Sequence, residues 1–297
     1  YDRHFADIQK ALSTLLEHAK NELGNINVSP VITGSGGLSL SKYLKVPFVQ
    51  EVIAVSTSLA DYAPHTDVAI ELGGEDAKII YFNSNGGIEQ RMNGICAGGT
   101  GSFIDQMASI LKTDAKGLNE YAQDYKSIYQ IAARCGVFAK SDVQPLINEG
   151  ATKPDLAASI FQAVVNQTIS GLACGKPIRG NIAFLGGPLH FLPELKRAFI
   201  RTLKLKEKEI ISPEHSHLFA ALGAAMHKDK DIVSDLDSLI NTLSVGIDMK
   251  MEVSRMKPLF ESQEEIDNSP RQDYGVVRPG DIKYLDVNGD APSSLRL

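Results

Sequence analysis

Two cysteines in this sequence stand just ahead of glycines and a predicted helix, where a thiol next to bare backbone could hold a metal. Cys96 comes just before Gly98 and Gly99, and Cys135 lies in "RCGVFAKSDV". Helical patterns follow both motifs, so each thiol is expected near a helix N-terminus, where the positive end of the backbone dipole stabilises the thiolate that binds metals. For either cysteine alone, a buried thiol acting as a small hydrophobic group is the alternative.

Two cysteines are too few for the four-thiolate shell of an iron–sulfur cluster, but two from each chain of a symmetric dimer would complete it. Cys174 lies on a predicted apolar helix face in "ISGLACG" and is expected to be a buried hydrophobic group. The histidines form no ligand set. His190, His215 and His217 lie near predicted helix starts, where capping or solvent contact is the ordinary role.

The segment "IELGGEDAK" could bind phosphate. It places Glu71 ahead of Gly73 and Gly74 and places Asp76 after them. Backbone N–H groups of the glycines could approach a phosphate, while Glu71 or Asp76 reaches its magnesium or a water. A solvated hairpin turn is the alternative.

The segment "FLGGPLHFLPELKRAF" repeats the glycine pair between a predicted buried strand and a helix. Gly186 and Gly187 could seat an adenine or ribose against bare backbone, or could merely allow close packing.

Strands and helices alternate along the chain, which is typical of α/β lobes. A first unit of about 65 residues opens with a helix over 5–23, and a second opens with three antiparallel strands that lead into the Cys96 loop. Helices are predicted next at 102–111, 127–134 and 139–149. Two such lobes in tandem would place a ligand in the cleft between them.

Composition excludes several partners. The chain has 297 residues and a formal net charge of −6, with no basic cluster for a phosphate backbone, so nucleic acid is not an expected partner. Purely apolar runs are shorter than a membrane span, and the N-terminus lacks a signal pattern. Three cysteines are too few for a disulfide framework. We therefore predict a cytoplasmic protein without membrane contact.

Five segments, taken in this order and at these spacings, resemble the activator ATPases of 2-hydroxyacyl-CoA dehydratases and the ATPase subunits of benzoyl-CoA reductase. This BadF/BadG/BcrA/BcrD family belongs to the actin, sugar kinase and Hsp70 superfamily. The likeness covers about residues 1–228 and is greatest to the first of two tandem modules in a large fused activase. The segments are "TGSGG", "IELGGEDAK", "NGICAGGTGSFIDQMA", "RCGVFAKSDV" and "FLGGPLHFLPELKRAF".

The resemblance implies an α/β, ribonuclease H-like (actin-like ATPase) fold of two lobes. Residues 1–66 would be a first lobe truncated at its N-terminus, and 67–228 a second lobe with the cysteine motifs. Residues 229–297 would be a C-terminal extension and linker, in which alternating apolar residues predict a strand at 245–253.

The same resemblance implies an ATP-dependent, electron-transferring activator. It would be a homodimer with one [4Fe-4S] cluster at its two-fold axis, bound by Cys96 and Cys135 of each chain. Reduced ferredoxin or flavodoxin would supply a low-potential electron, which ATP and Mg drive to a dehydratase-type or reductase-type acceptor. The remaining implied site residues are Glu71 as the catalytic group and Gly73, Gly74, Glu75, Asp76, Gly98, Gly99, Gly186 and Gly187 around the nucleotide.

The sequence departs from the family pattern at three points. The first phosphate loop is absent, so ATPase activity and tight ATP binding are expected of the full-length protein but not of these 297 residues. Glu71 stands where shorter activators have aspartate, and Lys140 stands where an acid is usual.

Two other functions remain open. A small-molecule kinase of the same superfamily would keep the glycine motifs, but it gives no reason for Cys96 and Cys135. A non-catalytic tandem module that only binds a neighbouring domain is the second, and the intact glycine motifs count against it.

Overall fold

The computed structural model describes residues 1–4, 7–83, 85–93, 98–132, 136–229 and 231–245. Residues 246–253, most of the strand predicted in the C-terminal extension, lie outside this part of the chain. All described residues belong to the unit Tyr1–Asp248.

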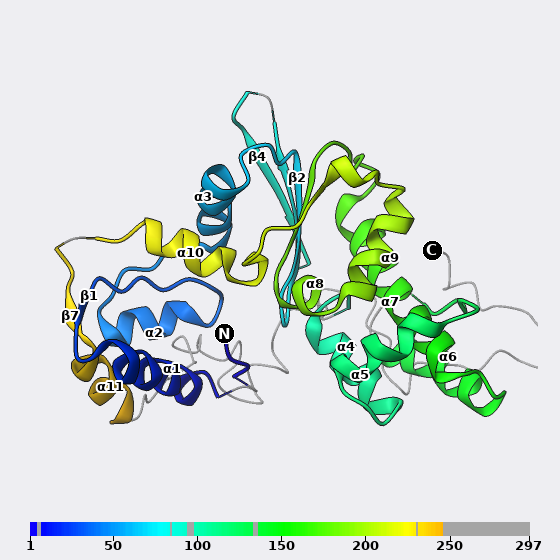
Figure 1. The fold of residues 1–297 in the computed structure, drawn as a ribbon, viewed down its shortest axis with the longest axis horizontal. Helices are drawn as coiled ribbons and strands as arrows, with labels where there is room; N and C mark the ends of the chain where they lie inside the picture. The colour runs from blue at the N-terminus through cyan, green and yellow to red at the C-terminus, as the bar shows by residue number, and fades with distance from the viewer. Residues whose placement is uncertain (5–6, 84, 94–97, 133–135, 230, 246–297) are drawn as a thin grey trace, which may run out of the picture. The chain divides into compact units, whose positions relative to one another are not determined.

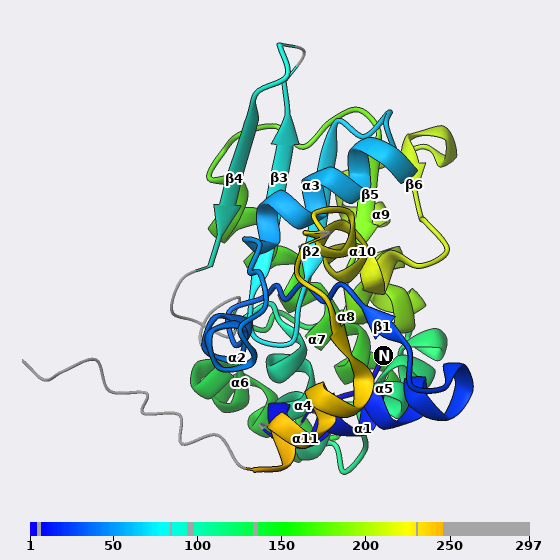
Figure 2. The same cartoon turned by 90° about the vertical axis from the view of Figure 1, so that its left-hand side faces the viewer.

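A five-stranded mixed sheet forms the centre of the fold (Figure 1). Its order is β4-β3-β2-β5-β6, in which β2, β3 and β4 are antiparallel neighbours and β2, β5 and β6 are parallel neighbours. Figure 2 shows the strands side by side in this order. The strands are β2 (Val68–Leu72), β3 (Ala77–Phe82), β4 (Ile88–Met92), β5 (Ile182–Leu185) and β6 (Ile210–Ile211).

Helices cover both faces of the sheet. Successive side chains of a strand point to opposite faces, and the central strands are apolar on both, so both faces must be covered. Ile70 and Phe184 belong to the larger core, which α7 and α9 cover, whereas Ala69 and Ala183 belong to a smaller core under α3 and α10. Figure 1 shows these two pairs of helices on opposite sides of the sheet. The helices are α3 (Glu51–Tyr62), α4 (Gly101–Ile110), α5 (Ala115–Tyr121), α6 (Gly136–Asn148), α7 (Lys153–Thr168), α8 (Gly187–Phe191), α9 (Pro193–Leu203) and α10 (Phe219–Met226).

Helix α7 and the π-helical turn η2 (Ile169–Ala173) form the longest apolar helical stretch of the described residues. Lys153–Ala173 is long and apolar enough to cross a membrane, but 67% of its apolar window is buried inside the fold. Core helices of soluble proteins pass the same test, so this stretch is weak evidence for a span.

Helices α3 and α10 pack with their backbones close together. A Cβ at Gly223 of α10 would lie 1.7 Å from the carbonyl oxygen of Ala54 in α3, so only glycine fits. The buried Ser58 hydroxyl of α3 also donates to the Phe219 carbonyl of α10. These contacts hold the two helices together as one unit.

The first residues of the chain and residues 234–244 form a second group of elements. Strand β1 (Asn27–Val28) pairs with β7 (Ser234–Asp235), and α1 (Ile8–Leu23) contacts α11 (Leu236–Ser244). Helix α2 (Gly37–Leu44) also contacts α11. Thus part of the predicted extension packs on the predicted first lobe.

The helix predicted at 127–134 is wrong over its described part, because residues 125–132 have no helical structure. Side chains from two helices satisfy this backbone instead. Asp155 accepts hydrogen bonds from the Lys126 and Ser127 N–H groups, and Asp142 accepts one from the Ala132 N–H. These long-range bonds replace the local bonds of a helix. The helices predicted at 102–111 and 139–149 are confirmed as α4 and α6.

Candidate nucleotide site

The turn between β2 and β3 carries the first glycine pair. The Gly73 N–H donates to the Asp76 carbonyl at 2.8 Å. A Cβ on Gly73 would lie 2.3 Å from Asp76 Oδ1, so packing explains this glycine. Gly74 is different, because it is exposed, its φ is not positive, and a Cβ there would meet nothing within 4 Å. Neither conformation nor packing within the chain requires a glycine at position 74.

The N-terminus of α4 rests on this turn. The Gly101 N–H donates to the Gly73 carbonyl at 3.0 Å, and the Ser102 N–H donates to the Gly74 carbonyl at 2.7 Å. The loop that contains Gly98 and Gly99 therefore ends directly beside the first glycine pair. Gly99 has a φ of +84° and lies against the Thr168 side chain of α7.

The second glycine pair lies at the matching end of the neighbouring parallel strand. Glu71 of β2 is in register with Leu185 of β5, and Gly186 follows. A Cβ on Gly186, whose φ is +89°, would lie 2.0 Å from the Leu72 carbonyl oxygen. Gly187 then begins α8. The two pairs thus meet at the carboxyl ends of adjacent parallel strands, a usual position for ligands in α/β folds.

A buried lysine joins three carboxylates beside the first turn. Lys78 of β3 is opposite Glu71 of β2, and its side chain is 2% exposed. Its Nζ lies 2.8 Å from Glu51 Oε1, 2.9 Å from Asp76 Oδ2 and 3.6 Å from Glu71 Oε2. One positive charge therefore faces three carboxylates from α3, the turn and β2.

Glu71 is the most deeply buried of the three carboxylates. Burial raises the pKa of the Glu71 carboxyl to about 7; Lys78 opposes the shift, and the charges of Glu51 and Asp76 add to it. Burial lowers the pKa of Lys78, but the carboxylates of Glu71, Glu51 and Asp76 outweigh burial and raise it above its usual value. Glu71 Oε2 accepts no hydrogen bond from the residues that the structure describes. A carboxyl that titrates near neutral pH can take up or release a proton during a reaction.

Two histidines beside the second pair stack on each other. The rings of His190 and His217 lie 3.9 Å apart, and His190 Nδ1 lies 2.9 Å from the Ser216 hydroxyl. Burial lowers the pKa of both imidazoles. Neither side chain caps a helix N-terminus, but both residues are partly exposed, so the solvent contact predicted from the sequence agrees with the structure. His217 is 27 residues beyond His190, so the stacked pair has no signal in the local sequence.

Cys96 and Cys135 lie outside the described residues. Helix α6 begins at Gly136, directly after Cys135. Within the part of the chain that the structure describes, no three His, Cys, Asp or Glu side chains are grouped to hold a metal. The predicted ligand set thus remains a prediction.

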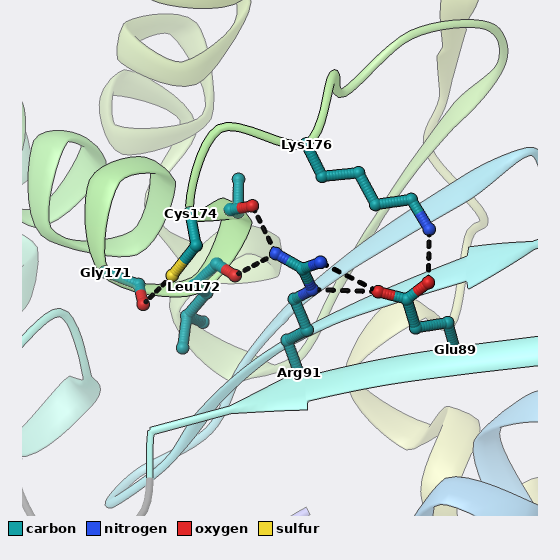
Figure 3. Close-up of polar contacts among 7 residues, drawn as sticks. Glu89, Arg91, Gly171, Leu172, Cys174 and Lys176 are labelled. Atoms are coloured by element: carbon teal, nitrogen blue, oxygen red, sulfur yellow. Dashed lines mark hydrogen bonds and ion pairs between the residues drawn. The ribbon is translucent and has the colours of Figure 1, made fainter.

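The sequence-based interpretation of Cys174 is wrong, because this cysteine is exposed. Helix α7 widens into the turn η2, which ends at Cys174 (Figure 3). Because Cys174 has a φ of +46°, its side chain does not continue the apolar face of the helix. Arg91 of β4 donates to the Leu172 and Ala173 carbonyls at the end of η2. Glu89 pairs with both Arg91 and Lys176.

The sheet order, the helices on both faces and the paired glycine turns define an actin-like, ribonuclease H-like ATPase fold. The chain belongs to the BadF/BadG/BcrA/BcrD ATPase family, whose model matches residues 2–227. Both the fold class and the family predicted from the sequence are confirmed.

Related proteins include activators of 2-hydroxyacyl-CoA dehydratases. The 2-hydroxyisocaproyl-CoA dehydratase activator of Clostridioides difficile is 31% identical over 66% of this chain and 72% of its own length. The lactoyl-CoA dehydratase activator of Anaerotignum propionicum is 28% identical over 74% of this chain and 82% of its own.

Two solved structures share the fold. Component A of the Acidaminococcus fermentans (R)-2-hydroxyglutaryl-CoA dehydratase has a TM-score of 0.63 and 27% identity, covering 75% of this chain and 83% of its own. The C. difficile activator, solved with bound ADPNP, has a TM-score of 0.64 and 26% identity, covering 83% and 85%.

Proposed function

We propose that this chain is part of an ATP-dependent activator that delivers a low-potential electron to a 2-hydroxyacyl-CoA dehydratase-type partner. The observation that carries the proposal is the meeting of two glycine turns at the ends of β2 and β5, in a chain of this family. Within the proposal, residues 1–66 and 67–228 are the two lobes, with 229–297 as the extension.

The two glycine turns have separate roles in the proposal. Gly73 and Gly74, with Glu75 and Asp76, bind phosphate, while Gly186 and Gly187 face the adenosine. Gly98 and Gly99 belong to the loop that ends on the first turn. The open space at Gly74 supports this assignment, because it lets a phosphate approach the backbone.

Glu71 is the proposed catalytic group. It is 6% exposed, and its Oε2 has no hydrogen-bond partner among the described residues. Mg²⁺ is usually held by one or two carboxylates together with substrate phosphates and water. The Glu71 carboxylate, with Asp76 beside the turn, fits this requirement; bound Mg²⁺ would neutralise charge on the phosphates.

The electron carrier in the proposal is a [4Fe-4S] cluster bound by Cys96 and Cys135 of two chains in a homodimer. Reduced ferredoxin or flavodoxin is the donor. The relatives' activity on dehydratases and the position of Cys135 directly before α6 support this part. The cluster would supply one-electron chemistry, while the nucleotide site would drive the delivery of the electron to the partner.

Replacing Gly74 by alanine is expected to weaken MgADP binding about tenfold or more while leaving the unfolding temperature unchanged. The added methyl group meets no atom of the chain but enters the space proposed for a phosphate. Calorimetric titration of the full-length protein with MgADP, together with thermal unfolding without nucleotide, measures both effects.

Gly87→Ala is the matched control, because Gly87 lies in the hairpin at the other end of β3 and the nearest atom to its Cβ is the Asn85 side chain. This variant should bind MgADP like the parent. Parental affinity in Gly74→Ala would mean that phosphate binds elsewhere, and absence of MgADP binding by the full-length parent would count against the nucleotide site itself.

A further inference from the structure

Lys78 is the most deeply buried charged side chain of the described residues, and its surroundings are unusual for a strand lysine. Its side chain is 2% exposed, although lysine is rarely buried fully unless it is paired. Its two short contacts, at 2.8 Å and 2.9 Å, go to Glu51 and Asp76, which lie on different elements. The ammonium therefore connects α3 to the β2–β3 turn.

Asp76 carries this connection into the glycine turn. Its carbonyl accepts the hydrogen bond from the Gly73 N–H, and its Oδ1 lies 2.3 Å from the position that a Cβ of Gly73 would take. Fixing the Asp76 side chain therefore also fixes the backbone at Gly73. The carbonyls of Gly73 and Gly74 in turn hold the N-terminus of α4.

Glu51 carries the connection in the other direction. It is the first residue of α3, whose next turn packs against α10 through the close contact of Ala54 with Gly223. Lys78 thus links the α3–α10 unit to the turn, because its ammonium contacts Glu51 of α3 and Asp76 of the turn. Buried apolar side chains could fill the same volume at similar stability, so packing alone does not explain an ion cluster here.

We propose that Lys78 is a positioning residue that couples the α3–α10 unit to the phosphate-binding turn. Through Asp76 it holds the Gly73–Gly74 backbone in the geometry that receives phosphate, and through Glu51 it ties that geometry to α3. This inference rests on the proposed function for the nucleotide, but the coupling itself concerns only residues of this chain.

The test separates positioning from simple charge repulsion. Lys78→Met leaves three carboxylates without their cation and is expected to unfold more easily. In the parent cluster, one lysine and three carboxylates have a formal charge of −2. The double variant Lys78→Met with Glu51→Gln keeps two carboxylates and no lysine, so its formal charge is also −2. This double variant should fold, yet it lacks the link.

Amide hydrogen exchange in nucleotide-free protein is the primary measurement. In the double variant, the Gly73 amide should exchange about tenfold faster than in the parent, because its hydrogen bond to the Asp76 carbonyl opens more often. Lys20→Met, which removes a half-exposed ion pair with Asp237, should leave that exchange unchanged. A parental exchange rate at the Gly73 amide in the folded double variant would overturn the proposal.

MgADP titration gives the second measurement. The double variant should bind about tenfold more weakly than the parent, and Lys20→Met should bind equally well. Equal binding by the double variant and the parent would also overturn the coupling. These titrations use the full-length protein, because tight nucleotide binding is not expected of these 297 residues alone. If the full-length parent bound no MgADP, the proposed function would fail, while the exchange result would still decide whether Lys78 positions the turn.

Discussion

Gly186→Ala is expected to lower the free energy of unfolding by about 3–5 kcal/mol, from backbone strain and overpacking together. Gly186 has φ +89° and ψ 162°, a region that essentially only glycine occupies. Its new Cβ would also lie 2.0 Å from the Leu72 carbonyl oxygen and 2.8 Å from the Leu72 carbonyl carbon. Both atoms belong to the backbone of β2, so no side-chain rotation can relieve the clash. Urea denaturation measures the loss.

Gly150→Ala separates the two causes. Gly150 has a similar φ of +87°, but a Cβ there would meet nothing within 4 Å. Strain alone should cost this variant about 1–2 kcal/mol. An equal loss in both variants would show that Gly186 and Leu72 are not in the close contact described above.

Glu71→Gln is expected to stabilise the protein at pH 8 by up to about 3 kcal/mol, the equivalent of raising the carboxyl pKa from 4.5 to about 7. Between these two pH values the folded protein binds more protons than the unfolded chain does. The free energy of unfolding of the parent therefore falls as the pH rises through this window and is constant above it. Glutamine has no proton to lose, so the variant should lack this fall.

Urea denaturation of the nucleotide-free protein at intervals from pH 5 to pH 8 tests this expectation. Glu75→Gln is the control, because Glu75 is exposed in the same turn and leaves Glu71 in place. The control should keep the parental pH dependence. A Glu71→Gln variant that is less stable than the parent at pH 8 would show that the ionised carboxylate stabilises the fold.

The sequence is sufficient to predict the sheet and most of its helices because their signals are local. Short apolar segments separated by turn residues mark β2 and β3, and glycine pairs mark the turns that follow β2 and β5. The helix predicted at 127–134 fails for a non-local reason. Asp155 and Asp142 bind the backbone N–H groups of this segment from α7 and α6, and no pattern within the segment records those partners.

The ion cluster could not be predicted for the same reason. In "EDAKIIYF", Lys78 has the appearance of a solvated residue near a strand end, because one of its partners, Glu51, lies 27 residues earlier. Glycine pairs were sufficient to locate the turns, but the difference between Gly73, which packing explains, and Gly74, which it does not, required the structure. The Cys174 prediction failed because a widened helical turn moves the residue off the apolar face.

In the proposed activator, two chains share a [4Fe-4S] cluster through Cys96 and Cys135. Anaerobic reconstitution with iron and sulfide, followed by iron analysis and measurement of molar mass, tests it most directly. We expect about four irons per two chains in a dimer. Cys96→Ser and Cys135→Ser should take up no such cluster, whereas Cys174→Ser, whose thiol is exposed at the end of η2, should take up the full amount. A cluster retained by either of the first two variants, or a parent that takes up no iron, would contradict it.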